Sequence, residues 1–300
     1  MSPDSTTNVE RTHFLVETDW LAEHLQDANL RIVDMRGYVR TVLHNGVQDA
    51  MYAGALEEYE QEHIPGAVYL DWTRDIVDLD DAVEAQIAPP EVFAQAMERA
   101  GIGDEHLVVA YDAHPASQFA TRLWWALNYY GHRKVVVLNG GFPKWQREER
   151  PVVASVPTCP TATFTPAVHP QLRATARDVL AALHQPGTWI IDARDRAQYT
   201  GELSRGHGRS GHIPGAINVP REELIDRDGT FRSTEALREV FTRAHITPEE
   251  HVIAYCNGGV AATTVLFSLA LLGYPALTNY DGSWNEWGSR TDLPTELVEH

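Results

Sequence analysis

The chain repeats itself once. Four segments of the first half recur in the second half in the same order, 142 to 158 positions further along. The pairs are IVDMRG (32–37) with IIDARD (190–195), HIPGAVYLDW (63–72) with HIPGAINVPR (212–221), VVAYD (108–112) with VIAYC (252–256), and NGGFPKW (139–145) with DGSWNEW (281–287). One pair could arise by chance, whereas four in order indicate a duplicated domain of about 140 residues rather than a short-period repeat.

A proline-rich segment separates the two copies. Residues 151–170 hold five prolines and no Asp, Glu, Lys or Arg. Proline removes a backbone donor and favours extended backbone, which is typical of a semi-rigid linker. We therefore expect a first domain at 1–150, a linker at 151–172 and a second domain at 173–300. Cys159 lies in this linker, and we interpret it as an incidental thiol.

Each copy shows the same alternation of short apolar runs and helical patterns. Runs rich in valine and isoleucine, such as 107–112 and 251–256, are typical of buried strands. Amphipathic patterns at 89–101 and 233–245 predict helices. The alternation predicts an α/β fold in which each domain is a parallel sheet with helices on both faces. Sites in such sheets form beyond the carboxyl ends of strands.

The composition narrows the class of partner. Lys and Arg number 24 against 42 Asp and Glu, which gives a net charge of −18. A chain this acidic is a poor candidate for binding nucleic acid or an anionic membrane surface, so an anionic substrate would need a local positive group. No transmembrane run or secretory signal is visible. With only two cysteines, we expect a cytoplasmic protein with free thiols.

Cys256 has the surroundings of a reactive thiol. It follows the strand pattern at 251–255 and precedes a turn and an apolar helical pattern. Glycines in the turn permit a tight loop whose backbone N–H groups face inward, and the helix start adds partial positive charge. Such surroundings favour an anionic sulfur, as thiolate or persulfide, so we interpret Cys256 as a nucleophile. The active-site loop is then Asn257, Gly258, Gly259, Val260, Ala261 and Ala262. The alternative is a buried, inert cysteine.

The first copy carries Asp112 where the second carries Cys256. A carboxylate cannot accept or pass on a sulfur atom, so we expect one working domain and one supporting domain. A Cys-x5-Arg phosphatase would need an arginine at the position that Ala262 holds. A Cys–His hydrolase stays open, because there are fourteen histidines, although none adjoins Cys256. Two isolated cysteines form no zinc cluster, so no metal is expected.

These motifs resemble the tandem-domain rhodanese sulfurtransferases over residues 15–290. The matching segments are the two HIPGA motifs, ERTHFLVETDWLAEHL, RLWWALNYYGHRKVVVLNGGFPKW, YCNGGVAATT and YDGSWNEWG. The resemblance implies that Cys256 forms a persulfide and that Asp112 marks an inactive N-terminal domain. It also implies a small anionic sulfur donor and an acceptor that is cyanide, a small thiol or a reduced thioredoxin-like protein, with no cofactor.

The chain departs from the family pattern at the substrate-binding positions. Members that use thiosulfate place basic residues after the cysteine, whereas this chain has Asn257 and Gly258. We therefore favour 3-mercaptopyruvate as the donor, although Gly258 lacks the hydroxyl usual in that branch. Thiosulfate is the alternative, and a non-catalytic binding or thiol-sensing protein is a second one. Gln198 holds the place of a substrate-binding arginine, so we expect Arg205 and Arg209 to attract the anion, unless their segment is only a solvated loop.

Residues kept in both copies are interpreted as structural. The pairs Asp34–Arg36 and Asp192–Arg194 occupy equivalent positions, as do the histidines that open the HIPGA motifs. Because the inactive copy also has these residues, we expect them to stabilise the fold rather than take part in the reaction. The segment 71–90, where mercaptopyruvate-using members tend to carry a histidine near the site, has none. A Ser–His–Asp relay that involves the first domain is therefore not expected.

Overall fold

The computed structural model describes residues 14–44, 47–183, 185–204 and 208–298. Its first five-stranded sheet consists of β1 (Leu15–Val16), β2 (Leu30–Asp34), β5 (Val68–Tyr69), β6 (Leu107–Tyr111) and β7 (Val135–Leu138). The second consists of β8 (Arg173–Ala174), β9 (Thr188–Asp192), β10 (Ile217–Asn218), β11 (His251–Tyr255) and β12 (Leu277–Tyr280). The strand orders are β1-β7-β6-β2-β5 and β8-β12-β11-β9-β10, and every neighbouring pair is parallel. Matching orders confirm the predicted duplication and the α/β class.

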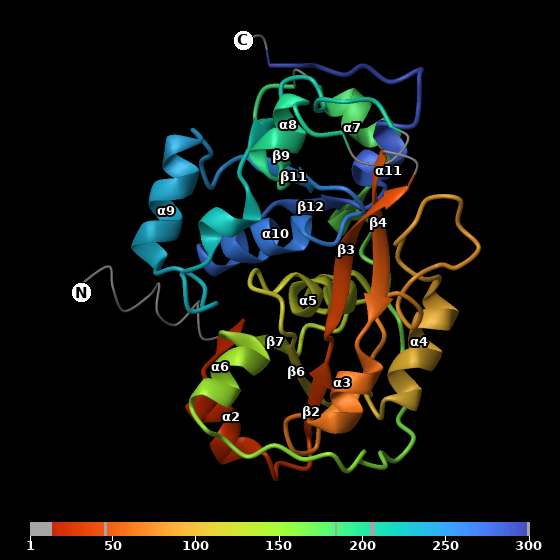
Figure 1. Ribbon diagram of the computed structural model, residues 1–300, viewed down its shortest axis with the longest axis vertical. Coiled ribbons are helices and arrows are strands. Elements are labelled where there is room, and N and C mark those ends of the chain that lie inside the picture. Colours follow the sequence, from red (N-terminus) through yellow and green to blue (C-terminus); the bar gives the residue numbers. More distant parts are fainter. Residues whose placement is uncertain (1–13, 45–46, 184, 205–207, 299–300) are drawn as a thin grey trace.

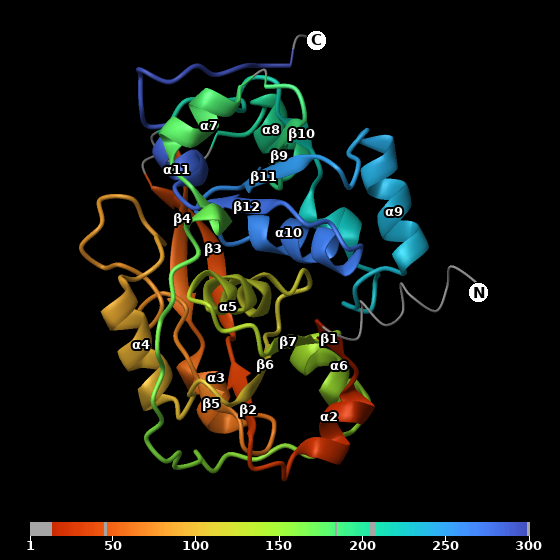
Figure 2. The ribbon, with the colours of Figure 1, turned by 180° about the vertical axis from the view of Figure 1, so that it is seen from behind.

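Helices cover both sheets, as Figures 1 and 2 show from opposite sides. The first half has α2 (Thr18–His24), α3 (Leu56–Gln61), α4 (Pro90–Arg99), α5 (Gln118–Tyr129) and α6 (Gly141–Arg147). The second half has α7 (Ala176–Ala182), α8 (Arg196–Thr200), α9 (Thr234–Arg243), α10 (Ala262–Leu271) and α11 (Ser283–Trp287). Two 3₁₀ turns, η1 (Pro170–Leu172) and η2 (Arg221–Leu224), complete the elements. The helices expected at 89–101 and 233–245 are α4 and α9. Ser233 caps α9 by accepting a hydrogen bond from the N–H of Ala236 at 3.2 Å.

An antiparallel hairpin of β3 (Gly37–His44) and β4 (Val47–Gly54) breaks the symmetry of the two halves. Its strands belong to neither five-stranded sheet. In Figures 1 and 2 it runs from the first half towards the second. The sequence analysis did not predict this hairpin, although Asn45 and Gly46 between its strands are a typical hairpin signal.

Two helices form the centre of the contact between the halves. All ten residues of α10 are buried, as are eleven of the twelve residues of α5. The rings of Trp124 and Phe267 meet edge to face with centroids 5.1 Å apart, and the hydroxyls of Thr121 and Thr263 lie 2.9 Å apart. One hydrophobic cluster runs through both halves. Because α5 and α10 each begin just after the loops of Asp112 and Cys256, this packing brings the two loops together.

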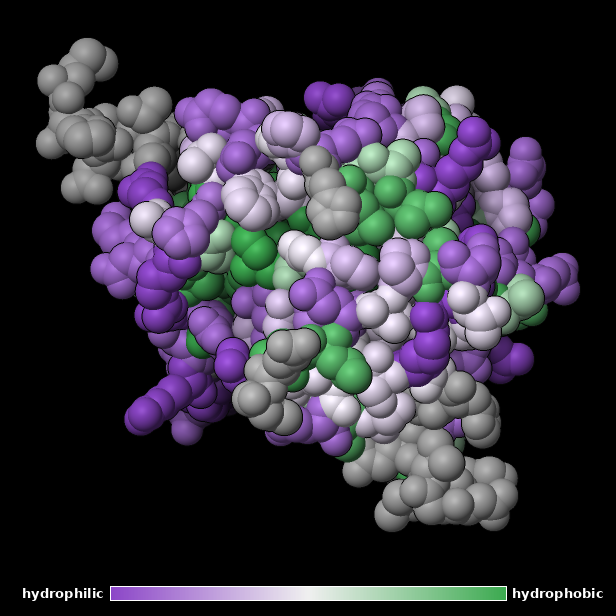
Figure 3. Space-filling model, turned by 90° about the horizontal axis from the view of Figure 1, so that it is seen from above, coloured by the Kyte–Doolittle hydropathy of each residue, from purple (hydrophilic) through white to green (hydrophobic). Residues whose placement is uncertain are grey.

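The surface of the second half is largely hydrophilic (Figure 3). Figure 3 looks at the end of the molecule formed by the second half, where hydrophilic side chains dominate the rim and hydrophobic ones show between them. Among the described residues, no helix has the length and apolar character needed to cross a bilayer. The expected linker is mostly without helix or strand, and its Phe164 is buried in the core of the first half.

Candidate active site

Cys256 lies at the carboxyl end of the central strand of the second sheet. Its strand β11 pairs with β9 on one side and β12 on the other. The Cys256 N–H donates to Ser283 Oγ at 3.1 Å, and its carbonyl accepts from the Trp284 N–H at 3.0 Å. The residue is only 3% exposed. The backbone of Cys256 is thus fixed from both sides, at the edge where sites form in parallel sheets.

The loop after Cys256 depends on Gly259. This glycine has φ +71°, and a Cβ there would lie 2.6 Å from the carbonyl oxygen of Asp281, so a larger residue would not fit. The Gly259 carbonyl accepts from Asn279 Nδ2 at 2.9 Å and from Arg122 Nη1 at 3.2 Å. Within the described chain, no hydrogen bond uses the backbone N–H groups of residues 258–261. These donors are therefore available to an anion at the start of α10.

In the first half, a carboxyl group fills the equivalent loop. Asp112 Oδ2 accepts from the N–H groups of Phe119 and Ala120 at 2.8 and 2.9 Å, and Oδ1 accepts from the N–H of His114 at 2.9 Å. Burial raises the pKa of Asp112 to about 7, despite these three hydrogen bonds. The Cys256 loop of the second half can hold an anionic sulfur. The equivalent loop of the first half is occupied by the side chain of Asp112.

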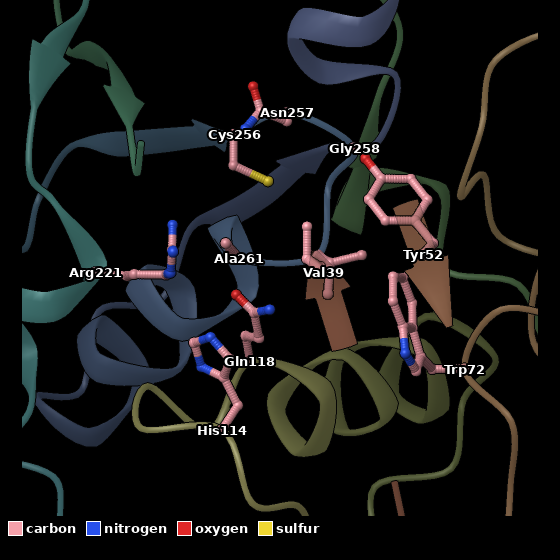
Figure 4. A pocket seen from close by; sticks show the side chains of 11 residues that line it. Val39, Tyr52, Trp72, His114, Gln118, Arg221, Cys256, Asn257, Gly258 and Ala261 are labelled. Atoms are coloured by element: carbon pink, nitrogen blue, oxygen red, sulfur yellow. The ribbon is translucent and has the colours of Figure 1, made fainter. Parts of the chain in front are cut away.

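A cavity of about 90 Å³ opens beside the Cys256 sulfur (Figure 4). Its lining residues come from the cysteine loop, the hairpin, the Asp112 loop and two HIPGA segments. They are Val39, Tyr52, Trp72, His114, Gln118, Arg221, Cys256, Asn257, Gly258, Val260 and Ala261. Both halves therefore build the site, which the sequence analysis had placed on the second half alone.

His114 brings an imidazole to this cavity. Its Nδ1 accepts a hydrogen bond from the N–H of Ala116 at 3.0 Å, so the proton of the neutral ring resides on Nε2. Burial, helped by the positive charge of Arg221, lowers the pKa of His114 to about 4. The ring is therefore neutral near pH 7 and presents an N–H donor. The sequence offered no neighbouring histidine for Cys256, and the fold supplies this one from the other half.

Gln198 supports the loop rather than lining the cavity. Its amide oxygen accepts from Asn257 Nδ2 at 2.9 Å, and its amide nitrogen donates to Asp195 at 2.5 Å. Both ends of the side chain are thus engaged within the second half. Ala262, the last residue of the expected loop, is the first residue of α10. Gln198 can hold Asn257 in place, but its amide does not face the sulfur.

Arg209, one of the two expected anion-binding arginines, does not line the cavity. Arg209 donates from Nη1 to the carbonyl of Leu293 at 2.7 Å and from Nη2 to the carbonyls of Arg290 and Trp287 at 2.5 and 3.1 Å. Its guanidinium thereby holds the C-terminal segment, because these carbonyls use its donors. Arg205 lies outside the described residues.

The residue pairs shared by both halves are structural, as expected. Arg36 forms a buried ion pair with Asp34, whose second partner is the hydroxyl of Tyr111 at 2.6 Å. The second half repeats the arrangement with Asp192, Arg194 and the Tyr255 hydroxyl, again at 2.6 Å. In each half the network joins the ends of two neighbouring strands.

The duplication itself contained a signal for the missed residues. Trp72 and Arg221 occupy the same position after the two HIPGA motifs, and both line the cavity. His114 and Gly258 likewise occupy equivalent positions in the two loops, and both line it. The cavity therefore lies where the two copies face each other. The sequence could therefore have indicated these residues, if equivalent positions of the two copies had been taken together as candidates for one shared site.

Comparisons with known proteins agree with this architecture. The model of the rhodanese-like domain matches residues 17–148 and 175–290. The 3-mercaptopyruvate sulfurtransferase of Escherichia coli strain K12 is 38% identical over 96% of this chain and 99% of its own length. A putative thiosulfate sulfurtransferase of Mycobacterium bovis is 36% identical over 80% of this chain and 87% of its own length.

A solved structure gives the same result. The crystal structure of SseA from Escherichia coli, described as a 3-mercaptopyruvate sulfotransferase with the rhodanese fold, matches with a TM-score of 0.79 and 34% identity. The match covers 90% of this chain and 98% of SseA. The resemblance inferred from the motifs is thereby confirmed, and the chain belongs to the rhodanese family.

Proposed function

We propose that this protein is a sulfurtransferase that carries a sulfur atom on Cys256 as a persulfide. The observation that carries the proposal is the contrast between the two loops. In one, Cys256 stands beside a cavity and a row of backbone N–H groups that have no partner among the described residues. In the other, Asp112 fills the loop with its own carboxyl group. The names of the relatives support the same chemistry.

The reaction has two steps. The Cys256 thiolate attacks the sulfur that the donor gives up, and a new S–S bond forms. The bond that held this sulfur breaks, and its electron pair leaves with the product. That product is sulfite from thiosulfate or the enolate of pyruvate from 3-mercaptopyruvate. The acceptor then attacks the outer sulfur of the persulfide, and the Cys256 thiolate leaves with the electron pair of the S–S bond.

The cavity offers donors to the negative charge that develops in these steps. The N–H groups of residues 258–261 have no described hydrogen-bond partner, and neutral His114, which lines the cavity, carries its proton on Nε2. The product enolate or sulfite gains charge as the bond to sulfur breaks. A fixed donor that meets this charge lowers the barrier without having to reorganise.

The preferred donor follows from the residues of the Cys256 loop. No cation follows Cys256 within its loop, which favours 3-mercaptopyruvate over thiosulfate. Relatives are named for each of the two donors, so thiosulfate is the alternative. The acceptor is cyanide, a small thiol or a reduced thioredoxin-like protein. The cytoplasmic location stays a prediction.

The test is a pair of steady-state assays with 3-mercaptopyruvate and with thiosulfate, each with cyanide as acceptor. Mass spectrometry of the intact protein and of the Cys256 peptide follows the gain of one sulfur atom. We expect turnover with 3-mercaptopyruvate to exceed that with thiosulfate. Cys256→Ser should abolish turnover and the adduct, whereas Cys159→Ser should keep both. Faster turnover with thiosulfate would reverse the donor, and no adduct with either donor would favour the binding or thiol-sensing alternative.

A further inference from the structure

We propose that Arg221 binds the anionic end of the sulfur donor. This inference rests on the proposed function and assigns the donor's recognition to a residue that is absent from the expected set. Arg221 begins η2, directly after the second HIPGA segment, and lines the cavity together with Cys256. Figure 4 shows it on the side of the cavity opposite Tyr52 and Trp72, at a height between Cys256 and His114.

The charges around the cavity point to this residue. Among the described lining residues, the basic side chains are Arg221 and His114, and His114 is neutral near pH 7, which leaves Arg221 as the cation. The whole chain has a net charge of −18, so an anionic donor is repelled unless a local cation attracts it. Gln198 is uncharged, and Arg209 does not line the cavity, because carbonyls of the C-terminal segment engage its guanidinium.

The guanidinium also has an unused donor. Arg221 Nε is buried and has no hydrogen-bond partner among the described residues, while Nη2 forms an ion pair with the exposed Glu222 at 2.9 Å. A buried donor without a partner is unfavourable, and native structures usually satisfy it with a ligand or water. An oxyanion in the cavity would satisfy Nε, and a guanidinium can bind a carboxylate or sulfonate through two parallel hydrogen bonds.

The duplication argues against a purely structural role. The equivalent residue of the first half is Trp72, which follows the same HIPGA turn and is buried. The turn therefore forms without an arginine. In the first half, the position carries an apolar wall of the cavity, whereas in the second it carries a cation on the opposite wall. The difference between Trp72 and Arg221 is expected if the first half shapes the cavity and the second half supplies its positive charge.

The test separates anion binding from catalysis. In a Cys159→Ser background, Cys256 is alkylated with iodoacetate, which is anionic, and with iodoacetamide, which is neutral. We expect Arg221→Gln to lower the ratio of the two second-order rate constants about 10–100-fold, as for loss of a charged hydrogen-bond partner. The iodoacetamide rate should stay unchanged, which shows an intact loop, and Arg221→Lys should recover part of the ratio.

Arg243→Gln is the matched control, because it removes the same charge from an exposed side chain of α9. We expect it to leave the ratio unchanged. For the donor that turns over, Arg221→Gln should raise KM by a similar factor with a smaller change in kcat. An unchanged ratio in Arg221→Gln, or an equal fall in Arg243→Gln, overturns the inference, even where turnover supports the sulfurtransferase. A fall in Arg221→Gln alone supports the anion site, even where no donor turns over.

Discussion

Replacing Arg122 with methionine should destabilise the protein by about 3–5 kcal/mol, the usual cost of removing one partner from a buried ion pair. Arg122 and Asp281 are each 1% exposed, and their closest N–O distance is 2.6 Å. Arg122 Nη2 also donates to the carbonyl of Ala85 at 2.9 Å, and Nη1 donates to the carbonyl of Gly259 at 3.2 Å. Methionine keeps an unbranched apolar stem but none of these donors.

The partners left behind determine this magnitude. Asp281 Oδ2 keeps the N–H of Ile87 at 2.8 Å and Arg173 at 3.3 Å. Arg122 is the one described hydrogen-bond donor to Oδ1, so that oxygen is left unpaired in the interior. The part-buried carbonyl of Ala85 also loses its described donor. Each unsatisfied group costs about 1–3 kcal/mol, and more if charged, which agrees with the figure for the pair. The contact between the halves and the support of Gly259 weaken together.

Urea unfolding followed by tryptophan fluorescence measures the change. Arg99→Met is the control, because Arg99 is 63% exposed and lies 3.6 Å from Asp75, and an exposed pair contributes about 0–1 kcal/mol. We also expect Arg122→Met to change the rate of alkylation of Cys256, since the loop at Gly259 loses one of its two side-chain supports. A loss of stability no larger than that of Arg99→Met would refute the reasoning.

Three further changes test the scaffold around the site. Ser283→Ala removes the acceptor of the Cys256 N–H and should cost about 1–3 kcal/mol in urea unfolding, together with a slower reaction of Cys256 with iodoacetamide; an unchanged rate would contradict it. Because burial raises the pKa of Asp112 to about 7 from its ordinary 3.8, the folded protein keeps a proton that the unfolded chain has released between these values. Stability should therefore fall by about 2–3 kcal/mol as the pH rises from 5 to 8, and Asp112→Asn should lack this slope; parallel profiles would argue against the assignment. Tyr255→Phe removes the hydroxyl that donates to Asp192 at 2.6 Å and should cost about 1–3 kcal/mol, so a neutral effect on the unfolding midpoint would contradict the network.

Local patterns were sufficient for the architecture. The apolar runs and amphipathic stretches have the periods of strands and helices, and their repetition predicted two similar parallel sheets. The order of strand, Cys256, glycine turn and helix also predicted the position of the candidate nucleophile. The position of a thiol at a strand end depends only on the few residues before and after it. The hairpin at 37–54 was missed although its Asn-Gly signal is local.

The sequence was a poorer guide to which charged side chains line the cavity. Arg209 has the charge that an anionic donor needs, but carbonyls 78 to 84 positions away in the sequence take up its donors. Arg221 ends the second HIPGA segment and His114 follows Asp112 by two positions, but neither lies in a pattern that predicts anion binding, yet both line the cavity. A guanidinium reaches several ångströms, so its partners depend on what packs nearby rather than on its neighbours along the chain.

The sequence by itself therefore determined the duplication, the sheet type and the asymmetry between Cys256 and Asp112, since each follows from residue order over short stretches. The tertiary structure alone decided which side chains surround the sulfur. The packing of α5 against α10 brings the two loops together across more than 140 positions of chain, and the hairpin of the first half reaches the second. The cavity exists only at this contact, and no short-range pattern specifies which residues of two separate folding units face each other.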